Sequence, residues 1–247
     1  MSELLSPPFI VLAELPAALR GQGYAAIDPT ALAELTGASL RDLQGLRASW
    51  GRLVTDAYLR DGGRYRRRRH SCYVLNAEVL EPCARRAHWQ PLEYNALHGG
   101  LERWFEPVED EVANSRAWHQ ILLGLGRVAS QLRGPQTWFV EAHQFRIDTL
   151  DGIGRPTPEG AHRDGVDLVA VLLVERHLVK GGETRVFDAR GRTGQRFTMS
   201  QPWTTLLLDD ARVIHESTPI QPLAPGGYRD TLVLTYRSKG FQGPPST

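Results

Sequence analysis

Gly160-Ala161-His162-Arg163-Asp164-Gly165 places an imidazole and a carboxylate two residues apart, with a glycine on each side. Side chains of an extended segment alternate between two faces, so His162 and Asp164 share one face and Arg163 points the other way. One short segment therefore supplies two candidate metal ligands. The best candidate for a third ligand is His215, in a later stretch that we predict to be a strand.

Two neutral imidazoles and one carboxylate on one face of a metal are the ligand set of non-haem Fe(II) oxygenases, where other coordination positions stay open. The long separation between Asp164 and His215 favours a β-barrel over a single helix. A His-x-Asp pair alone is weak evidence, because the histidine can occupy a turn and the aspartate can cap a strand. The same three ligands also suit catalytic zinc, so a metal-dependent hydrolase is an alternative.

Arg229 opens a segment, 229–236, whose β-branched and apolar residues predict a strand. On such a strand Arg229 and Thr231 share a face. A guanidinium donates two parallel hydrogen bonds to a carboxylate, and a neighbouring hydroxyl adds a third. The pair is thus a candidate carboxylate site, although an arginine at a strand start is also common on protein surfaces.

Together these segments resemble the 2-oxoglutarate/Fe(II) dioxygenases, and within them the bacterial free-amino-acid hydroxylases, such as the isoleucine and leucine dioxygenases and their biofilm-associated relatives. The resemblance covers about residues 138–237. It rests on a strand-like segment before the His-x-Asp motif, the motif itself, a glycine turn, the distal histidine and the Arg-x-Thr step: 143–148, 158–165, 181–184, His215 and 229–231.

The resemblance implies an α+β fold with a double-stranded β-helix core, a cupin-like jelly roll, and N-terminal helices packed outside. It also implies an enzyme that uses Fe(II), 2-oxoglutarate and O2, with His162, Asp164 and His215 as metal ligands and catalytic residues. Arg229 and Thr231 would bind 2-oxoglutarate. Relatives that transfer halide have a small residue in place of the carboxylate, so Asp164 favours hydroxylation.

For substrate binding we expect Gln144 and Arg146, which share one face of their strand while His143 and Phe145 lie on the other. We expect the polar face to point inward, because a buried cation beside an open site needs an anionic partner. This favours a free L-amino acid or similar small carboxylate as substrate. The alternatives are the same chemistry on a protein or nucleic acid, and a cupin-like metal-binding protein without enzymatic activity.

The length of 247 residues, with 41% hydrophobic and 23% charged residues, is typical of one soluble domain with a sizeable core. We expect a single domain over 1–247, divided into an N-terminal helical and mixed elaboration (1–137), the β-helix core (138–237) and a loose tail (238–247). The net charge of +1 gives no global field that would attract nucleic acid or an anionic membrane.

Two cysteines, Cys72 and Cys83, are too few for a disulfide scaffold, and we expect both to be reduced. The N-terminus has no signal-peptide pattern, and the apolar run 168–174 is too short to cross a bilayer. These features predict a cytoplasmic protein.

Helices are predicted at 15–19 and 30–35, from Ser39 to Trp50, and from Ser115 to about Leu132, where apolar residues recur every three or four positions. Short stretches separated by glycine and proline predict strands. They are 138–147, 162–164, 168–174, 184–187, 196–199, 204–208, 213–216 and 229–236.

The run Arg64-Tyr65-Arg66-Arg67-Arg68-Arg69 is rich enough in arginine to suggest a nucleic-acid patch. We prefer a strand, because the flanking residues favour β-structure and alternate arginines would then face opposite ways. Acidic residues at 78, 81, 93 and 106–111 are candidates to neutralise the arginines.

Overall fold

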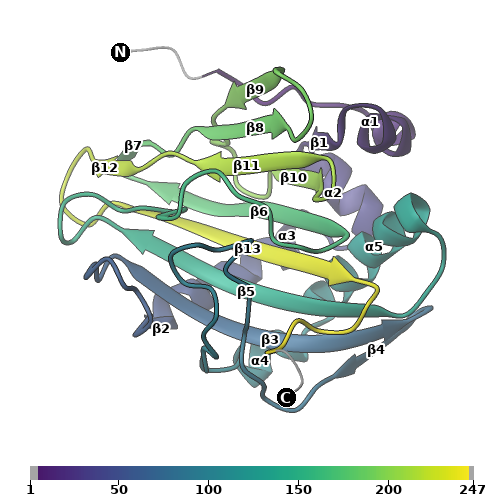
Figure 1. Ribbon diagram of the computed structural model, residues 1–247, viewed down its shortest axis with the longest axis horizontal. Coiled ribbons are helices and arrows are strands. Elements are labelled where there is room, and N and C mark those ends of the chain that lie inside the picture. Colours follow the sequence, from purple (N-terminus) through teal and green to yellow (C-terminus); the bar gives the residue numbers. More distant parts are fainter. Residues whose placement is uncertain (1–4, 245–247) are drawn as a thin grey trace.

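A computed structural model describes residues 5–244, and it is built around an eight-stranded antiparallel major sheet (Figure 1). Seven of its strands follow the order β1-β10-β6-β13-β5-β3-β2, and β4 pairs with β3. Their bounds are β1 Tyr24–Ile27, β2 Val54–Thr55, β3 Arg66–Asn76, β4 Val79–Pro82, β5 Trp138–Asp148, β6 Leu168–His177, β10 Thr205–Asp209 and β13 Tyr228–Arg237.

Two smaller sheets complete the jelly roll. One has the order β11-β8-β9 and the other pairs β12 with β7. Their strands alternate along the sequence with strands of the major sheet. Their bounds are β7 Val179–Gly181, β8 Thr184–Asp188, β9 Gly194–Phe197, β11 Val213–Ser217 and β12 Ile220–Pro222. This arrangement is the double-stranded β-helix expected from the sequence.

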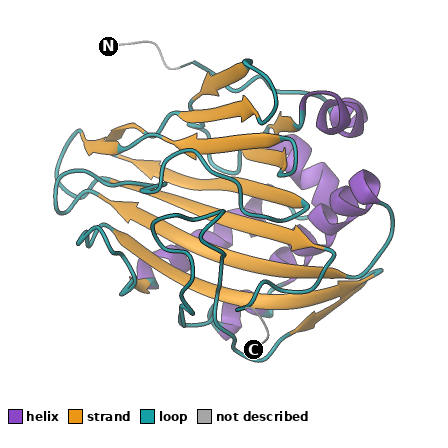
Figure 2. Cartoon of the chain, viewed as in Figure 1, coloured by secondary structure: helices purple, strands orange, loops and turns teal. Residues whose placement is uncertain are grey.

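The helices lie against the major sheet on the side away from the smaller sheets (Figure 2). They are α1 Leu15–Gln22, α2 Pro29–Thr36, α3 Leu40–Leu46, α4 Asp110–Ala113 and α5 Arg116–Arg133, with 3₁₀ turns η1 Leu12–Glu14 and η2 Arg47–Arg52. Asp28, Ser39 and Ser115 cap the starts of α2, α3 and α5 by accepting a backbone N–H, and the helices begin after Ser39 and Ser115 as predicted.

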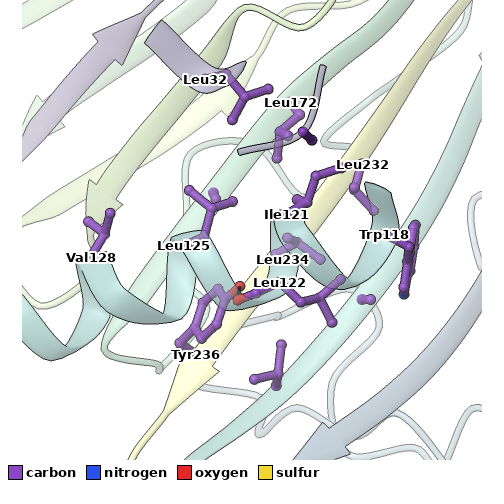
Figure 3. Packing of buried hydrophobic residues seen from close by; sticks show 14 of the residues in the cluster. Leu32, Trp118, Ile121, Leu122, Leu125, Val128, Leu172, Leu232, Leu234 and Tyr236 are labelled. Atoms are coloured by element: carbon purple, nitrogen blue, oxygen red, sulfur yellow. Dashed lines mark hydrogen bonds between the residues drawn. The ribbon is translucent and has the colours of Figure 1, made fainter. Parts of the chain in front are cut away.

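Helix α5 holds the main core together. Its apolar face packs onto the helix-facing side chains of β13 and β6, and Figure 3 shows Leu125 and Ile121 among the labelled side chains of this cluster. The Tyr236 hydroxyl donates to the Leu122 carbonyl at 2.8 Å, which ties the sheet to the helix. Because β13 alternates, burying Leu232, Leu234 and Tyr236 against the helices leaves the other face of the strand for the site.

A second apolar cluster closes the space between the major sheet and the β11-β8-β9 sheet. It contains Val169 and Leu173 of β6, Val186 of β8 and Val213 of β11, all at most 1% exposed. This cluster fills one part of the gap between the sheets, and polar residues line the other part.

Three details differ from the prediction. Residues 162–164 form no strand, and His162 makes an isolated antiparallel bridge to His215. Strands β1 to β4 come from the first 137 residues, so the sheet extends beyond 138–237. The tail is packed at Phe241 and Gln242, which line the cavity, whereas residues 243 and 244 are exposed and residues 245–247 lie outside the described part.

Strand β3 confirms the alternation expected of the arginine run. Arg66 and Arg68 are 5% and 3% exposed and point inward, whereas Arg67 and Arg69 lie on the opposite face. In residues 5–244, no helix is both long and apolar enough to cross a membrane.

Candidate active site

The bridge between His162 and His215 brings two predicted metal ligands together. Their backbones exchange hydrogen bonds of 3.0 and 2.9 Å. The Nδ1 of His162 lies 2.9 Å from the carbonyl of Gly160. A carbonyl only accepts, so Nδ1 carries the proton and Nε2 presents its lone pair.

Asp164 completes the triad. Its Oδ1 lies 3.9 Å from His162 Nε2, and its Oδ2 lies 3.7 Å from His215 Nε2. Burial raises the pKa of Asp164 and lowers that of His215 well below its ordinary value, because both groups lose water. Neutral imidazoles beside a carboxylate are the donor set that a divalent iron requires, so the three residues fit the metal.

The loop that carries Asp164 is shaped by Asp210. The Asp210 carboxylate accepts the backbone N–H groups of Asp164, Gly165 and Val166 at 2.9, 2.7 and 3.1 Å. Gly165 has φ +75°, and a Cβ there would lie 2.4 Å from the Tyr94 ring. The sequence therefore needs glycine at this end of the His-x-Asp motif.

Gln90 contacts the metal triad from the N-terminal part of the chain. Its amide nitrogen donates to Asp164 Oδ1 at 3.2 Å, and its carbonyl accepts from Arg103 at 2.9 Å and from Asn95 at 3.2 Å. The backbone N–H of His98 donates to the side-chain oxygen of Asn95, which fixes the orientation of the Asn95 amide as well. Because Arg103 can only donate, the amide nitrogen of Gln90 must face Asp164.

Arg229 and Thr231 lie on the cavity face of β13 and are 3% and 4% exposed. Within residues 5–244, Arg229 Nε and Nη2 are buried without a hydrogen-bond partner. Burial lowers the pKa of Arg229 to about 10, which leaves it protonated at neutral pH. A buried cation with unused donors fits a carboxylate, and the binding of 2-oxoglutarate by Arg229 and Thr231 stays a prediction.

A cavity of about 130 Å³ lies between the triad, Arg229 and the inward face of β5. Phe139, Glu141, His143, Phe145 and Ile147 of β5 line it. At its other side, the Gln242 amide donates to the backbone carbonyls of Asp164 and Gly165 at 2.9 and 3.0 Å.

The prediction of the inward face of β5 is therefore wrong, and the structure does not bring Gln144 and Arg146 to the cavity. Gln144 donates to the Ser49 hydroxyl at 2.9 Å on the helix side. Arg146 forms two hydrogen bonds with Asp230 at 2.8 and 2.7 Å and stacks on Tyr228. Asp230, a neighbour on β13, supplies the anionic partner that the sequence argument had assigned to a substrate.

Besides Arg229 and Arg237 of β13, the cations that line the cavity come from β3 and from the loop after β4. Arg66 and Arg68 share Asp56, at 2.7 and 3.9 Å, and Arg68 also lies between the Phe105 and Phe145 rings. Arg66 Nη2, Arg68 Nε and Arg103 Nε are buried without partners among the described residues. These groups form the arginine wall, defined as Arg66, Arg68 and Arg103.

Next to the arginine wall, four buried side chains form the histidine–glutamate cluster: His70, His88, Glu141 and His143. Each histidine has a ring nitrogen close to Glu141 Oε2, at 3.1 Å for His70, 2.6 Å for His88 and 3.4 Å for His143. His88, Glu141 and His143 line the cavity. Alternation along β3 and β5 would have identified Arg66, Arg68 and His70 on one strand and Glu141 and His143 on the other as sharing the inward face, whereas His88 comes from the loop after β4.

A family model described as 2OG-Fe dioxygenase matches residues 47–235, most of the chain. The chain belongs to this family. The 2OG-Fe dioxygenases use Fe(II), 2-oxoglutarate and O2, and the protein is accordingly a dioxygenase.

Solved structures agree with this assignment. The dioxygenase is 52% identical to a BsmA homologue from Methylobium petroleophilum PM1, with a TM-score of 0.92 and coverage of 99% of this chain and 100% of that one. A protein named IDO from Bacillus thuringiensis shares the fold at 18% identity, TM-score 0.75, with 92% and 99% of the two chains covered. The Fe(II)/α-ketoglutarate-dependent dioxygenase TqaL shares it at 20% identity, TM-score 0.70, with 95% and 89% covered. No protein with a curated description matches the dioxygenase.

Proposed function

We propose that the dioxygenase hydroxylates a free amino acid or a similarly small carboxylate, and releases succinate and CO2. In this proposal His162, Asp164 and His215 hold Fe(II), and Arg229 with Thr231 binds the distal carboxylate of 2-oxoglutarate. The observation that carries it is a single cavity with a metal-ligand triad at one side and buried arginine donors without partners at two others.

Iron, 2-oxoglutarate and O2 supply the oxidising power when they are bound, and the chain supplies binding and orientation. His162 presents Nε2 because Gly160 holds the proton on Nδ1. Asp164 would be a ligand of the metal at the position that halide transfer needs free, which favours hydroxylation. Arg229 positions the co-substrate from a buried site, where its charge is weakly screened.

The register of the sheet supports a substrate site on Arg68, close to the co-substrate site that we propose at Arg229 and Thr231. Arg68 pairs with Phe145, which in turn pairs with Thr231, so Arg68 and Thr231 are two strand spacings apart, about 10 Å. A substrate carboxylate on Arg68 and Arg103 would then lie over Phe145 and beside the triad. This replaces Arg146 as the candidate substrate-binding arginine.

The arginine run gives no support to a nucleic-acid target. Arg66 and Arg68 are buried, Arg67 lies 3.3 Å from Asp148, and Arg69 lies 3.4 Å from Glu109. Paired and buried arginines cannot form a continuous phosphate-binding surface.

The test is a screen of free amino acids and small carboxylic acids for substrate-dependent conversion of 2-oxoglutarate to succinate, followed by the mass of the product. A gain of one oxygen atom in one small molecule is the expected result. Turnover with oligonucleotides or peptides, and with none of the small acids, would contradict the proposal.

We also propose a cytoplasmic location, supported by Cys72 and Cys83, which are both free thiols in the structure. Cell fractionation with thiol labelling tests this. Recovery of the protein in an oxidising compartment would contradict it.

A further inference from the structure

We propose that Glu141 binds the amino group of the substrate, so that the cavity recognises an α-amino acid as a zwitterion, with its ammonium on Glu141 and its carboxylate on the arginine wall. This inference rests on the proposed function and makes it more specific. It starts from the observation that the histidines contact only one of the two carboxylate oxygens of Glu141.

The hydrogen bonds from His70 and His88 to Glu141 go to Oε2, and His143 Nε2 also lies nearest to this oxygen, at 3.4 Å. Oε1 accepts none from residues 5–244, and it is not among the buried atoms without partners. Glu141 lines the cavity and its side chain is 9% exposed. The three histidines therefore hold the carboxylate by one oxygen and leave the other available to a ligand.

The charge of Glu141 is preserved by the same contacts. Arg68 Nη2 lies 2.7 Å from His143 Nδ1, and because a guanidinium only donates, the proton of His143 must be on Nε2, toward Glu141. Burial would raise the pKa of Glu141, but the electrostatic effect of His88 and the hydrogen bonding of the three imidazoles hold it well below its ordinary value. Burial also lowers the pKa of His88 to about 3 and that of His143 well below normal, so the imidazoles are neutral donors.

The cluster consequently keeps one negative charge that no histidine neutralises. On the same wall, Arg66, Arg68 and Arg103 carry three positive charges, and Asp56 balances one of them. Glu141 and the incompletely paired arginines together are complementary to a ligand that carries one positive and one negative charge. A plain carboxylate would leave Glu141 Oε1 facing the cavity without a donor.

A second metal ion in the histidine–glutamate cluster is a weaker explanation. Three of the ring nitrogens already donate protons to Glu141, and a metal would need them deprotonated on those same atoms. The Arg68 guanidinium, in contact with His143, also disfavours a further cation. The number of bound metal ions separates the two explanations.

A second carboxylate, Glu159, also lines the cavity. Its Oε1 lies 3.8 Å from His162 Nε2 of the metal triad, and its Oε2 is buried without a partner among the described residues, so the experiment below includes it. We favour Glu141 because His143 connects it to the arginine wall, with Nε2 3.4 Å from Glu141 Oε2 and Nδ1 2.7 Å from Arg68 Nη2.

The test compares each amino acid that stimulates succinate formation with its 2-hydroxy acid, in which a hydroxyl replaces the amino group. For the wild type, the 2-hydroxy acid should need about ten-fold to a hundred-fold more substrate for half-maximal turnover. Glu141→Gln keeps the size and should raise the KM of the amino acid by a similar factor, while the KM of the 2-hydroxy acid changes less than about two-fold. Glu183→Gln, which alters a carboxylate paired with Arg185 outside the cavity, is the matched control and should leave both KM values unchanged.

Equal use of amino acids and 2-hydroxy acids by the wild type would overturn the assignment and leave the proposed function intact, and this result needs no folded variant. Loss of the preference in Glu159→Gln but not in Glu141→Gln would also overturn it. Two metal ions per wild-type chain, with one lost in Glu141→Gln, would favour the second metal site. Absence of stimulation by every small carboxylate would overturn the proposed function, and the role of Glu141 with it.

Discussion

Replacing Arg229 by alanine tests the co-substrate site. Arg229 is 3% exposed, and its Nε and Nη2 have no partner among the described residues, so a bound carboxylate would take both donors in a site with little water. Losing such a charge-assisted pair costs about 2–4 kcal/mol, which is roughly thirty-fold to nearly a thousand-fold in affinity. We expect the apparent requirement for 2-oxoglutarate to rise by this factor.

The assay is succinate formation as a function of 2-oxoglutarate concentration, with Fe(II) binding measured separately and expected to stay nearly unchanged. Arg146→Ala is the matched control, because this arginine lies on the adjacent strand and points to the other face, where Asp230 binds it. An unchanged 2-oxoglutarate requirement in Arg229→Ala would refute the reasoning. Arg237, which also lines the cavity, would then be the next candidate.

Three further variants test other parts of the structure. Arg146→Ala should lower the free energy of unfolding by roughly 1–3 kcal/mol, because the buried Asp230 carboxylate loses its partner; urea denaturation measures this. An altered substrate KM would contradict the position of Arg146 outside the cavity. Gln90→Ala should weaken Fe(II) binding about 10-fold to 100-fold in an anaerobic titration, because Asp164 loses the amide that orients it; wild-type affinity would show that Gln90 is dispensable. Leu125→Ala should cost about 2–5 kcal/mol of stability in the α5 core, while the activity of the folded fraction is retained.

The sequence predicted the structure correctly where a local pattern of residues is compatible with only one type of secondary structure. Ser115, followed by apolar residues three or four apart, predicted α5 and its cap. The alternation of Arg66 to Arg69 predicted opposite faces on a strand, which the burial of Arg66 and Arg68 confirms. The His-x-Asp motif and His215 indicated a shared site, although these residues meet through a bridge and not through a strand.

The face of β5 could not be predicted in the same way, because both faces of this strand carry polar residues and both are largely buried. Arg146 points away from the cavity because Asp230 lies opposite it. The register of β13 and β5, two segments far apart in the sequence, fixes that position. Gln90 and Arg103 posed the same problem. Gln90 contacts Asp164 and Arg103 contacts Gln90, and both residues come from a loop segment whose contact with the distant His-x-Asp motif depends on the fold.

Anaerobic titration with Fe(II) is the most direct test of the metal centre formed by His162, Asp164 and His215. The wild type should bind one equivalent tightly, and alanine at any of the three positions should abolish that site while the protein remains folded, as shown by its circular dichroism. If all three variants bind Fe(II) as the wild type does, these residues do not hold the iron, and the proposed active site is wrong.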